Sequence, residues 1–111
     1  WVLLIMFQRL FIIAFLLYSA CVSAGFNDGN ALFNACSNGD GYFKEGQCLG
    51  YVTGVFDSYE DTYICAPNHV TAGQAKDIVV KYLAEHPGKR HEPAAFLVGL
   101  ALMDVFPCKK S

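Results

Sequence analysis

The chain has 111 residues, a formal net charge of −2 and an apolar content of 54%. Apolar residues make up 20 of the first 24 positions but 40 of the following 87, so an apolar leader precedes a segment of ordinary composition. This composition excludes intrinsic disorder, a collagen-like chain and a multi-domain enzyme. Beyond Ala24, seven basic residues stand against ten acidic ones. Because no basic excess remains, we expect no nucleic-acid partner.

Residues 1–24 have the pattern of a secretory signal peptide. Arg9 gives the start a positive charge, and the uncharged apolar run 10–20 is shorter than a membrane span. The run Val22-Ser23-Ala24 then carries small residues at the positions that signal peptidase requires. The sequence therefore predicts export and cleavage after Ala24.

This cleavage would define a mature domain over 25–111, located in the periplasm and without membrane contact. We interpret residues 1–5 as upstream translation. Two alternatives remain open for the leader. One is a retained membrane anchor that begins at Trp1, and the other is a lipoprotein in which Cys21 carries the lipid.

Two helices are predicted before residue 62. Capping side chains at 27–30 and a glycine-rich break at 37–41 enclose a short first helix. A second helix is predicted over 44–61. One face of this helix carries residues at helical spacing, namely Cys48, Val52, Val55, Phe56 and Tyr59.

The second predicted helix also carries a stripe of glycines, Gly46, Gly50 and Gly54. Each glycine costs about 1 kcal/mol relative to alanine in an isolated helix, so another interaction is needed to compensate. Because glycine lets a second backbone approach closely, we interpret the stripe as the crossing point of another helix of the same chain. A dimer seam is the alternative.

Two further helices complete the predicted domain. The third starts at a capping box formed by Thr71 and Gln74, and His86-Pro87-Gly88 stops it. Its predicted inner face consists of Ala75, Ile78, Val79, Tyr82 and Leu83. The fourth helix, from Pro93 to Phe106, is apolar almost all round and is expected at the centre. Short loops favour antiparallel neighbours, so we expect an all-α, up-down bundle of about four helices.

The mature chain keeps four of the five cysteines, an even number typical of disulfides in an oxidising compartment. In an up-down bundle, Cys36 and Cys48 lie at one end and Cys65 and Cys108 at the other. A helix of about 24 Å separates the two ends, which is far beyond the reach of a disulfide. The sequence therefore predicts the pairs Cys36–Cys48 and Cys65–Cys108.

No group of residues indicates catalysis, a cofactor or a metal. A Cys-His nucleophile would leave an odd thiol, and cysteines in disulfides cannot bind zinc together with His86 and His91. We interpret Asp57, Glu60 and Asp61 as a solvated acidic face and not as a catalytic carboxylate pair. We therefore expect neither enzymatic activity nor a cofactor.

The stretch between the third and fourth helices favours protein recognition. It is charged, contains Pro87, and connects two packed helices, so it can enter a partner's cleft at little ordering cost. The candidate partner-binding residues are Glu85, His86, Lys89, Arg90, His91 and Glu92. The alternative is a solvated connector in which His86 bonds the last carbonyls of the third helix and His91 caps the fourth.

Several motifs spread over the mature chain occur together in one known family. They are Cys48-Leu49-Gly50-Tyr51-Val52-x-Gly54, Ile64-Cys65-x-Pro67, Val70-Thr71-x-x-Gln74, Tyr82-Leu83-x-x-His86-Pro87-x-x-Arg90-His91, Ala94-Ala95-x-Leu97-Val98 and Phe106-Pro107-Cys108. In combination they resemble the Rap/Tai immunity proteins of type VI secretion systems. The resemblance implies a non-catalytic, all-α periplasmic protein, often a homodimer, that binds and blocks a peptidoglycan amidase effector. A general periplasmic helical binding protein or chaperone is the alternative function, and a secreted enzyme is a third.

Overall fold

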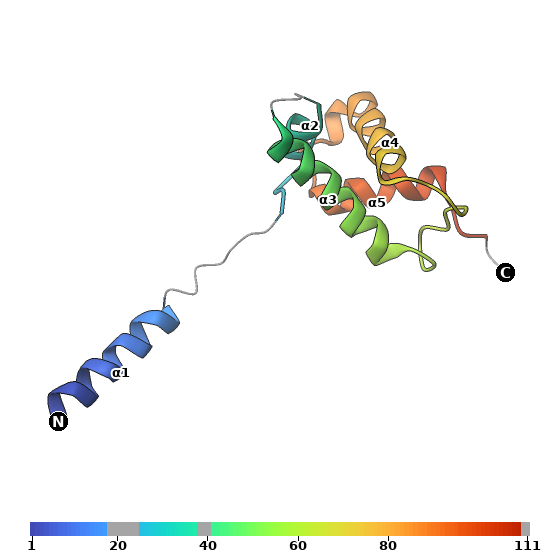
Figure 1. The fold of residues 1–111 in the computed structure, drawn as a ribbon. Coiled ribbons are helices and arrows are strands. Elements are labelled where there is room, and N and C mark those ends of the chain that lie inside the picture. The colour runs from blue at the N-terminus through green and yellow to red at the C-terminus, as the bar shows by residue number, and fades with distance from the viewer. Residues whose placement is uncertain (18–24, 38–40, 110–111) are drawn as a thin grey trace.

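The computed structural model describes residues 1–17, 25–37 and 41–109, and Figure 1 shows its ribbon. Its elements are α1 (Val2–Leu17), α2 (Gly29–Ser37), α3 (Tyr42–Tyr59), α4 (Ala72–Glu85), the 3-10 turn η1 (Pro87–Lys89) and α5 (Ala94–Val105). Over these ranges there is no strand, and only isolated bridges join Ile64 to Glu60 and to Pro107. The predicted all-α class is confirmed.

Helix α1 stands apart from the other helices in Figure 1. The side chains of residues 1–16 are all exposed, so this part of the predicted leader contributes nothing to the core. The predicted cleavage point after Ala24 and the alternative lipid site at Cys21 lie outside the described residues. Where the chain is described, no helix is both long enough and apolar enough to span a membrane.

Helices α2 and α4 begin at capping side chains that the sequence indicated. The Asp28 carboxylate accepts a hydrogen bond from the amide of Ala31 in the first turn of α2, at 2.9 Å. At the start of α4, the amide of Gln74 donates to the Thr71 hydroxyl at 3.1 Å, and the amide of Thr71 donates to the Gln74 side chain at 2.8 Å. The predicted capping box is therefore confirmed.

Helix α5 contributes more of the core than any other described helix. Its buried residues are Ala94, Leu97, Val98, Gly99, Ala101 and Leu102. They pack with residues of α2, α3, α4 and the loop after α3, namely Leu32, Cys48, Val52, Ile64, Ala75, Val79 and Leu83. The predicted central position of this helix is confirmed. Its outer face is nevertheless uncovered, since Phe96 is 55% exposed and Val105 is 49% exposed.

Two disulfides join the ends of the helices in the predicted pairs. Cys36 and Cys48 link the end of α2 to α3, with Cα atoms 5.2 Å apart. Cys65 and Cys108 link the segments that follow α3 and α5, with Cα atoms 4.8 Å apart. The amide of Cys65 also donates to the carbonyl of Phe106 at 2.9 Å. Helices α3 and α5 therefore end on the same side of the domain, as the ribbon in Figure 1 shows.

The interpretation of the glycine stripe as an intramolecular helix crossing was wrong. A Cβ atom placed on Gly46, Gly50 or Gly54 would meet no described atom within 4 Å. Helix α3 buries the face that contains Cys48 and Val52, which turns the glycines toward solvent. The stripe lines an open groove of about 700 Å³, whose other lining residues are Gly25, Phe26, Gln47, Tyr51, Val55 and Ser58.

Candidate functional site

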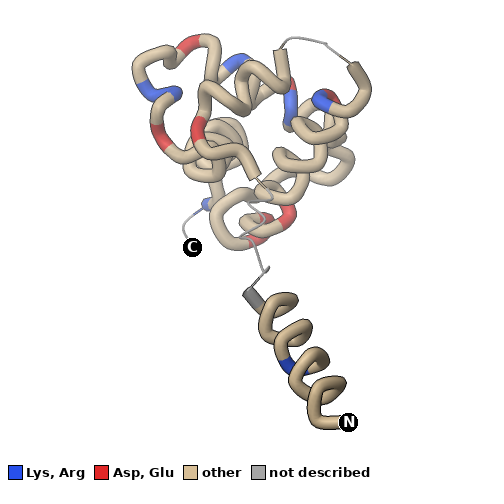
Figure 2. Tube along the Cα trace, turned by 90° about the vertical axis from the view of Figure 1, so that its left-hand side faces the viewer, with Lys and Arg blue, Asp and Glu red and all other residues tan. Residues whose placement is uncertain are grey.

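The predicted recognition segment, which we call the connector loop, comprises residues 85–92, from the last residue of α4 to the segment that precedes α5. It contains the 3-10 turn at Pro87–Lys89. Basic and acidic residues both occur along it, and Figure 2 marks these residue types in blue and red. The loop therefore presents a mixed-charge surface.

The backbone of the connector loop is bonded to the first turn of α2. The amide of Gly29 donates to the carbonyl of Glu92 at 3.0 Å, and the amide of Asn30 donates to the carbonyl of Arg90 at 2.9 Å. These amides have no acceptor within their own helix, so the loop carbonyls satisfy them. A Cβ on Gly29 would clash with the side chain of Leu97 and lie 2.9 Å from the Arg90 carbonyl. Glycine is therefore required at this close approach.

The side chain of Arg90 is directed back into the domain. Its Nε donates to the carbonyl of Leu83 at 2.6 Å, and its Nη2 donates to the carbonyl of Ala84 at 3.4 Å. Its guanidinium carbon lies 4.1 Å from the ring centroid of Phe33 on α2. The half-buried guanidinium thus bonds the last carbonyls of α4 and makes a cation–π contact with α2.

His86 is also engaged within the domain. Its Nδ1 lies 2.8 Å from the carbonyl of Tyr82, and because a carbonyl accepts, the ring proton is on Nδ1. The imidazole stacks on the Tyr82 ring with centroids 4.2 Å apart. The structure places His86 at the last carbonyls of α4, as the solvated-connector alternative expected.

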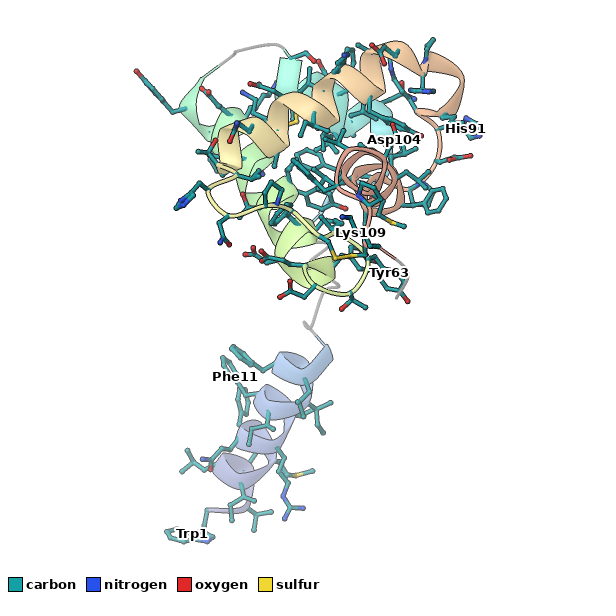
Figure 3. All side chains as sticks on the ribbon, turned by 90° about the vertical axis from the view of Figure 1, so that its right-hand side faces the viewer. Trp1, Phe11, Tyr63, His91, Asp104 and Lys109 are labelled. Atoms are coloured by element: carbon teal, nitrogen blue, oxygen red, sulfur yellow. A yellow bond between two sulfur atoms is a disulfide. The ribbon has the colours of Figure 1, made fainter. Side chains whose placement is uncertain are left out.

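The outward side chains of the loop are those of Glu85, Lys89 and His91, all exposed. Figure 3 shows His91 pointing away from the domain. In the described part of the chain, the side chains of Lys89 and His91 make no hydrogen bond or ion pair, whereas Glu85 lies 3.9 Å from the ammonium of Lys81. Of the six candidate residues, these three have side chains available to a partner, while Glu92 is half-buried.

Sequence reasoning missed the residues that hold the loop in place. Neither Gly29 nor Phe33 was a candidate, because their contacts reach across the fold to Arg90 and Glu92. The only local signal was the capping pattern around Asp28, which marked the start of α2 but not its neighbour.

Tyr51 of α3 contacts both Phe26, which precedes α2, and Ala95 of α5. Its ring meets that of Phe26 edge to face, with centroids 5.3 Å apart. Burial raises the pKa of the Tyr51 hydroxyl, and a hydrogen bond with the backbone of Ala95 lowers it in part. Tyr51 also lines the groove beside the glycine stripe, so one wall of that groove is fixed by internal contacts.

The other polar residues that the structure describes form no recognisable chemical centre. Asp57, Glu60 and Asp61 are exposed at the end of α3. Within the described ranges, no three or more His, Cys, Asp or Glu side chains are grouped closely enough to hold a metal ion.

Comparison with known protein families gives a match over residues 28–108. The matching model is that of Rap1a immunity proteins, and the match runs from the capping residue of α2 to the second disulfide. The match includes the connector loop and excludes α1. A comparison with curated proteins finds no match. The resemblance inferred from the sequence motifs is confirmed, and the chain belongs to the family of Rap1a immunity proteins.

Proposed function

We propose that the protein acts in the periplasm, where it binds and blocks a peptidoglycan amidase effector of a type VI secretion system. The observation that carries this proposal is the family match over 28–108, which makes the chain an immunity protein for a secreted effector. The amidase target and type VI delivery rest on the resemblance of the sequence motifs. Family membership supports a binding function without catalysis.

The proposed mechanism is steric occlusion of the effector's active-site cleft by the connector loop. The loop is attached to α2 by two backbone hydrogen bonds and to α4 by the side chain of Arg90. A loop that is ordered before binding loses little conformational entropy on entering a cleft. In this proposal Glu85, Lys89 and His91 contact the effector, and their charges select the partner.

The proposed location follows from two features of the chain. Both cysteine pairs form disulfides, which persist in an oxidising compartment. The exposed apolar helix α1 lies within the stretch that we propose as a signal peptide over 1–24. Mass spectrometry of the protein from its host should find Gly25 as the amino terminus and no free thiol. An intact leader or four free thiols would contradict this location.

The resemblance also implies a homodimer, which we retain as part of the proposal. Sedimentation equilibrium of the oxidised protein should give twice the mass of the mature chain. A single-chain mass at all concentrations up to about 100 times the effector Kd would show that the monomer is the binding unit.

The function is tested by adding the oxidised exported protein to a panel of purified type VI peptidoglycan amidases, with peptidoglycan as substrate. We expect stoichiometric inhibition of one amidase or a few related ones. Lys89→Glu should weaken that inhibition, whereas Lys44→Glu, the same charge change on an exposed residue of α3, should not. Equally weakened inhibition by both variants would show that the connector loop is not the effector-binding site. Equal affinity for many unrelated unfolded proteins would favour the general binding protein instead, which could use the exposed face of α5.

A further inference from the structure

We infer that Arg90 is a positioning residue of the connector loop, which holds Lys89 and His91 in the conformation that the effector binds. The inference rests on the proposed function, because it assigns different roles to neighbouring residues of the same site. It removes Arg90 from the set of residues that contact the effector.

The side chain of Arg90 contacts the carboxyl end of α4. The last carbonyls of a helix lack intrahelical donors, and the helix dipole favours a positive charge beside them. Arg90 supplies both the missing donors and the positive charge, since its guanidinium donates to the carbonyl of Leu83 at 2.6 Å and to that of Ala84 at 3.4 Å. The bond to Leu83 spans seven positions, so it folds the start of the loop back onto the end of the helix.

Arg90 also contacts α2. The same guanidinium lies 4.1 Å from the ring centroid of Phe33, while the carbonyl of Arg90 accepts from the amide of Asn30 at 2.9 Å. One residue therefore joins the loop to two helices, through its side chain and through its main chain. A lysine could not replace it, because an ammonium cannot donate in a planar fork and also stack on a ring.

The orientation of Arg90 affects the two residues beside it. Because the Arg90 side chain points into the domain, those of Lys89 and His91 on either side of it remain exposed and unpaired within the described residues. His91 projects from the edge of the domain in Figure 3. If this conformation were populated only in part, the apparent affinity for a partner would be the intrinsic affinity multiplied by the populated fraction.

The contacts of Arg90 with α4 and α2 are tested first without a partner, by amide hydrogen exchange on the oxidised full chain. Arg90→Ala and Arg90→Lys should accelerate exchange at Gly29 and Asn30 at least tenfold, because the loop carbonyls that protect these amides move away. The control is Thr71→Ala, which destabilises the other end of α4 and should leave these two amides unchanged. Unchanged exchange in both Arg90 variants overturns the inference.

The positioning role is then tested on the amidase that the wild-type protein inhibits. Arg90→Ala should slow association at least tenfold and alter dissociation less, whereas Lys89→Ala should mainly accelerate dissociation. Association by Arg90→Ala at the wild-type rate, with exchange accelerated, overturns the positioning role. If the wild-type protein inhibits no amidase, the proposed function fails, while the exchange measurement still decides whether Arg90 holds the loop.

Discussion

The guanidinium carbon of Arg90 lies 4.1 Å from the ring centroid of Phe33, and this contact joins the loop before α5 to the first helix of the domain. Partly desolvated cation–π pairs contribute about 0.5 to 2 kcal/mol. In a double-mutant cycle with Phe33→Leu and Arg90→Ala, we expect a coupling in the lower half of that range. Urea unfolding of the wild type, the two single variants and the double variant measures this coupling. If the losses in unfolding free energy of the single variants add up to that of the double variant, the contact contributes nothing in solution.

Gly29 is required by a close approach in the fold, whereas the stripe glycines Gly46, Gly50 and Gly54 face open space. Gly29→Ala should destabilise the protein by about 1–3 kcal/mol, because the new Cβ would clash with Leu97 and press against the Arg90 carbonyl. Gly50→Ala should stabilise it by up to about 1 kcal/mol, because the added methyl meets open space and raises helix propensity. Both free energies come from chemical unfolding. A loss of stability in Gly50→Ala would mean that a backbone, such as that of a second copy, packs on the stripe in solution.

The two disulfides should differ in their contribution to stability. Cys36 and Cys48 are 12 positions apart, and Cys65 and Cys108 are 43 apart. Closing loops of these lengths restricts the unfolded chain at a free-energy cost of about 3 and about 4 kcal/mol. Paired alanine substitutions, compared by urea unfolding, should therefore cost more at Cys65–Cys108. The reverse order would mean that the buried position of Cys48 outweighs the loop length.

Tyr51 should make stability fall at alkaline pH. Burial raises the pKa of its hydroxyl in the folded protein above the ordinary value of 10.0, so the native state holds this proton more tightly than the unfolded state. The stabilisation is complete below pH 10 and is lost as the pH rises through the folded pKa. Tyr51→Phe should reduce the fall in unfolding free energy between pH 8 and about 12. Tyr42→Phe is the control, because Tyr42 is 95% exposed, and an equal effect of both variants would reject this assignment.

Local signals in the sequence predicted the elements of the fold. The capping box at Thr71 and Gln74 starts α4, and Pro93 precedes the first residue of α5. The cysteine pairs could be predicted from the order of the helices alone, since only one pairing keeps the linked residues at the same end.

The candidate site was predicted only in outline, because its organisation depends on contacts across the fold. The charged composition of 85–92 indicated a recognition loop, but nothing near Arg90 in the sequence showed that its side chain would turn toward Phe33. The predicted helix crossing at the glycine stripe was wrong for the same reason. Helical periodicity places Gly46, Gly50 and Gly54 on one face, but it does not specify whether another helix covers that face.

The most direct test of the account is titration of an actively hydrolysing type VI peptidoglycan amidase with the oxidised protein. We predict that activity falls linearly to zero at a fixed molar ratio for the cognate amidase, and that Lys89→Glu shifts the curve to higher protein concentrations. Undiminished hydrolysis by every amidase at a large excess of the folded, oxidised protein would contradict the account.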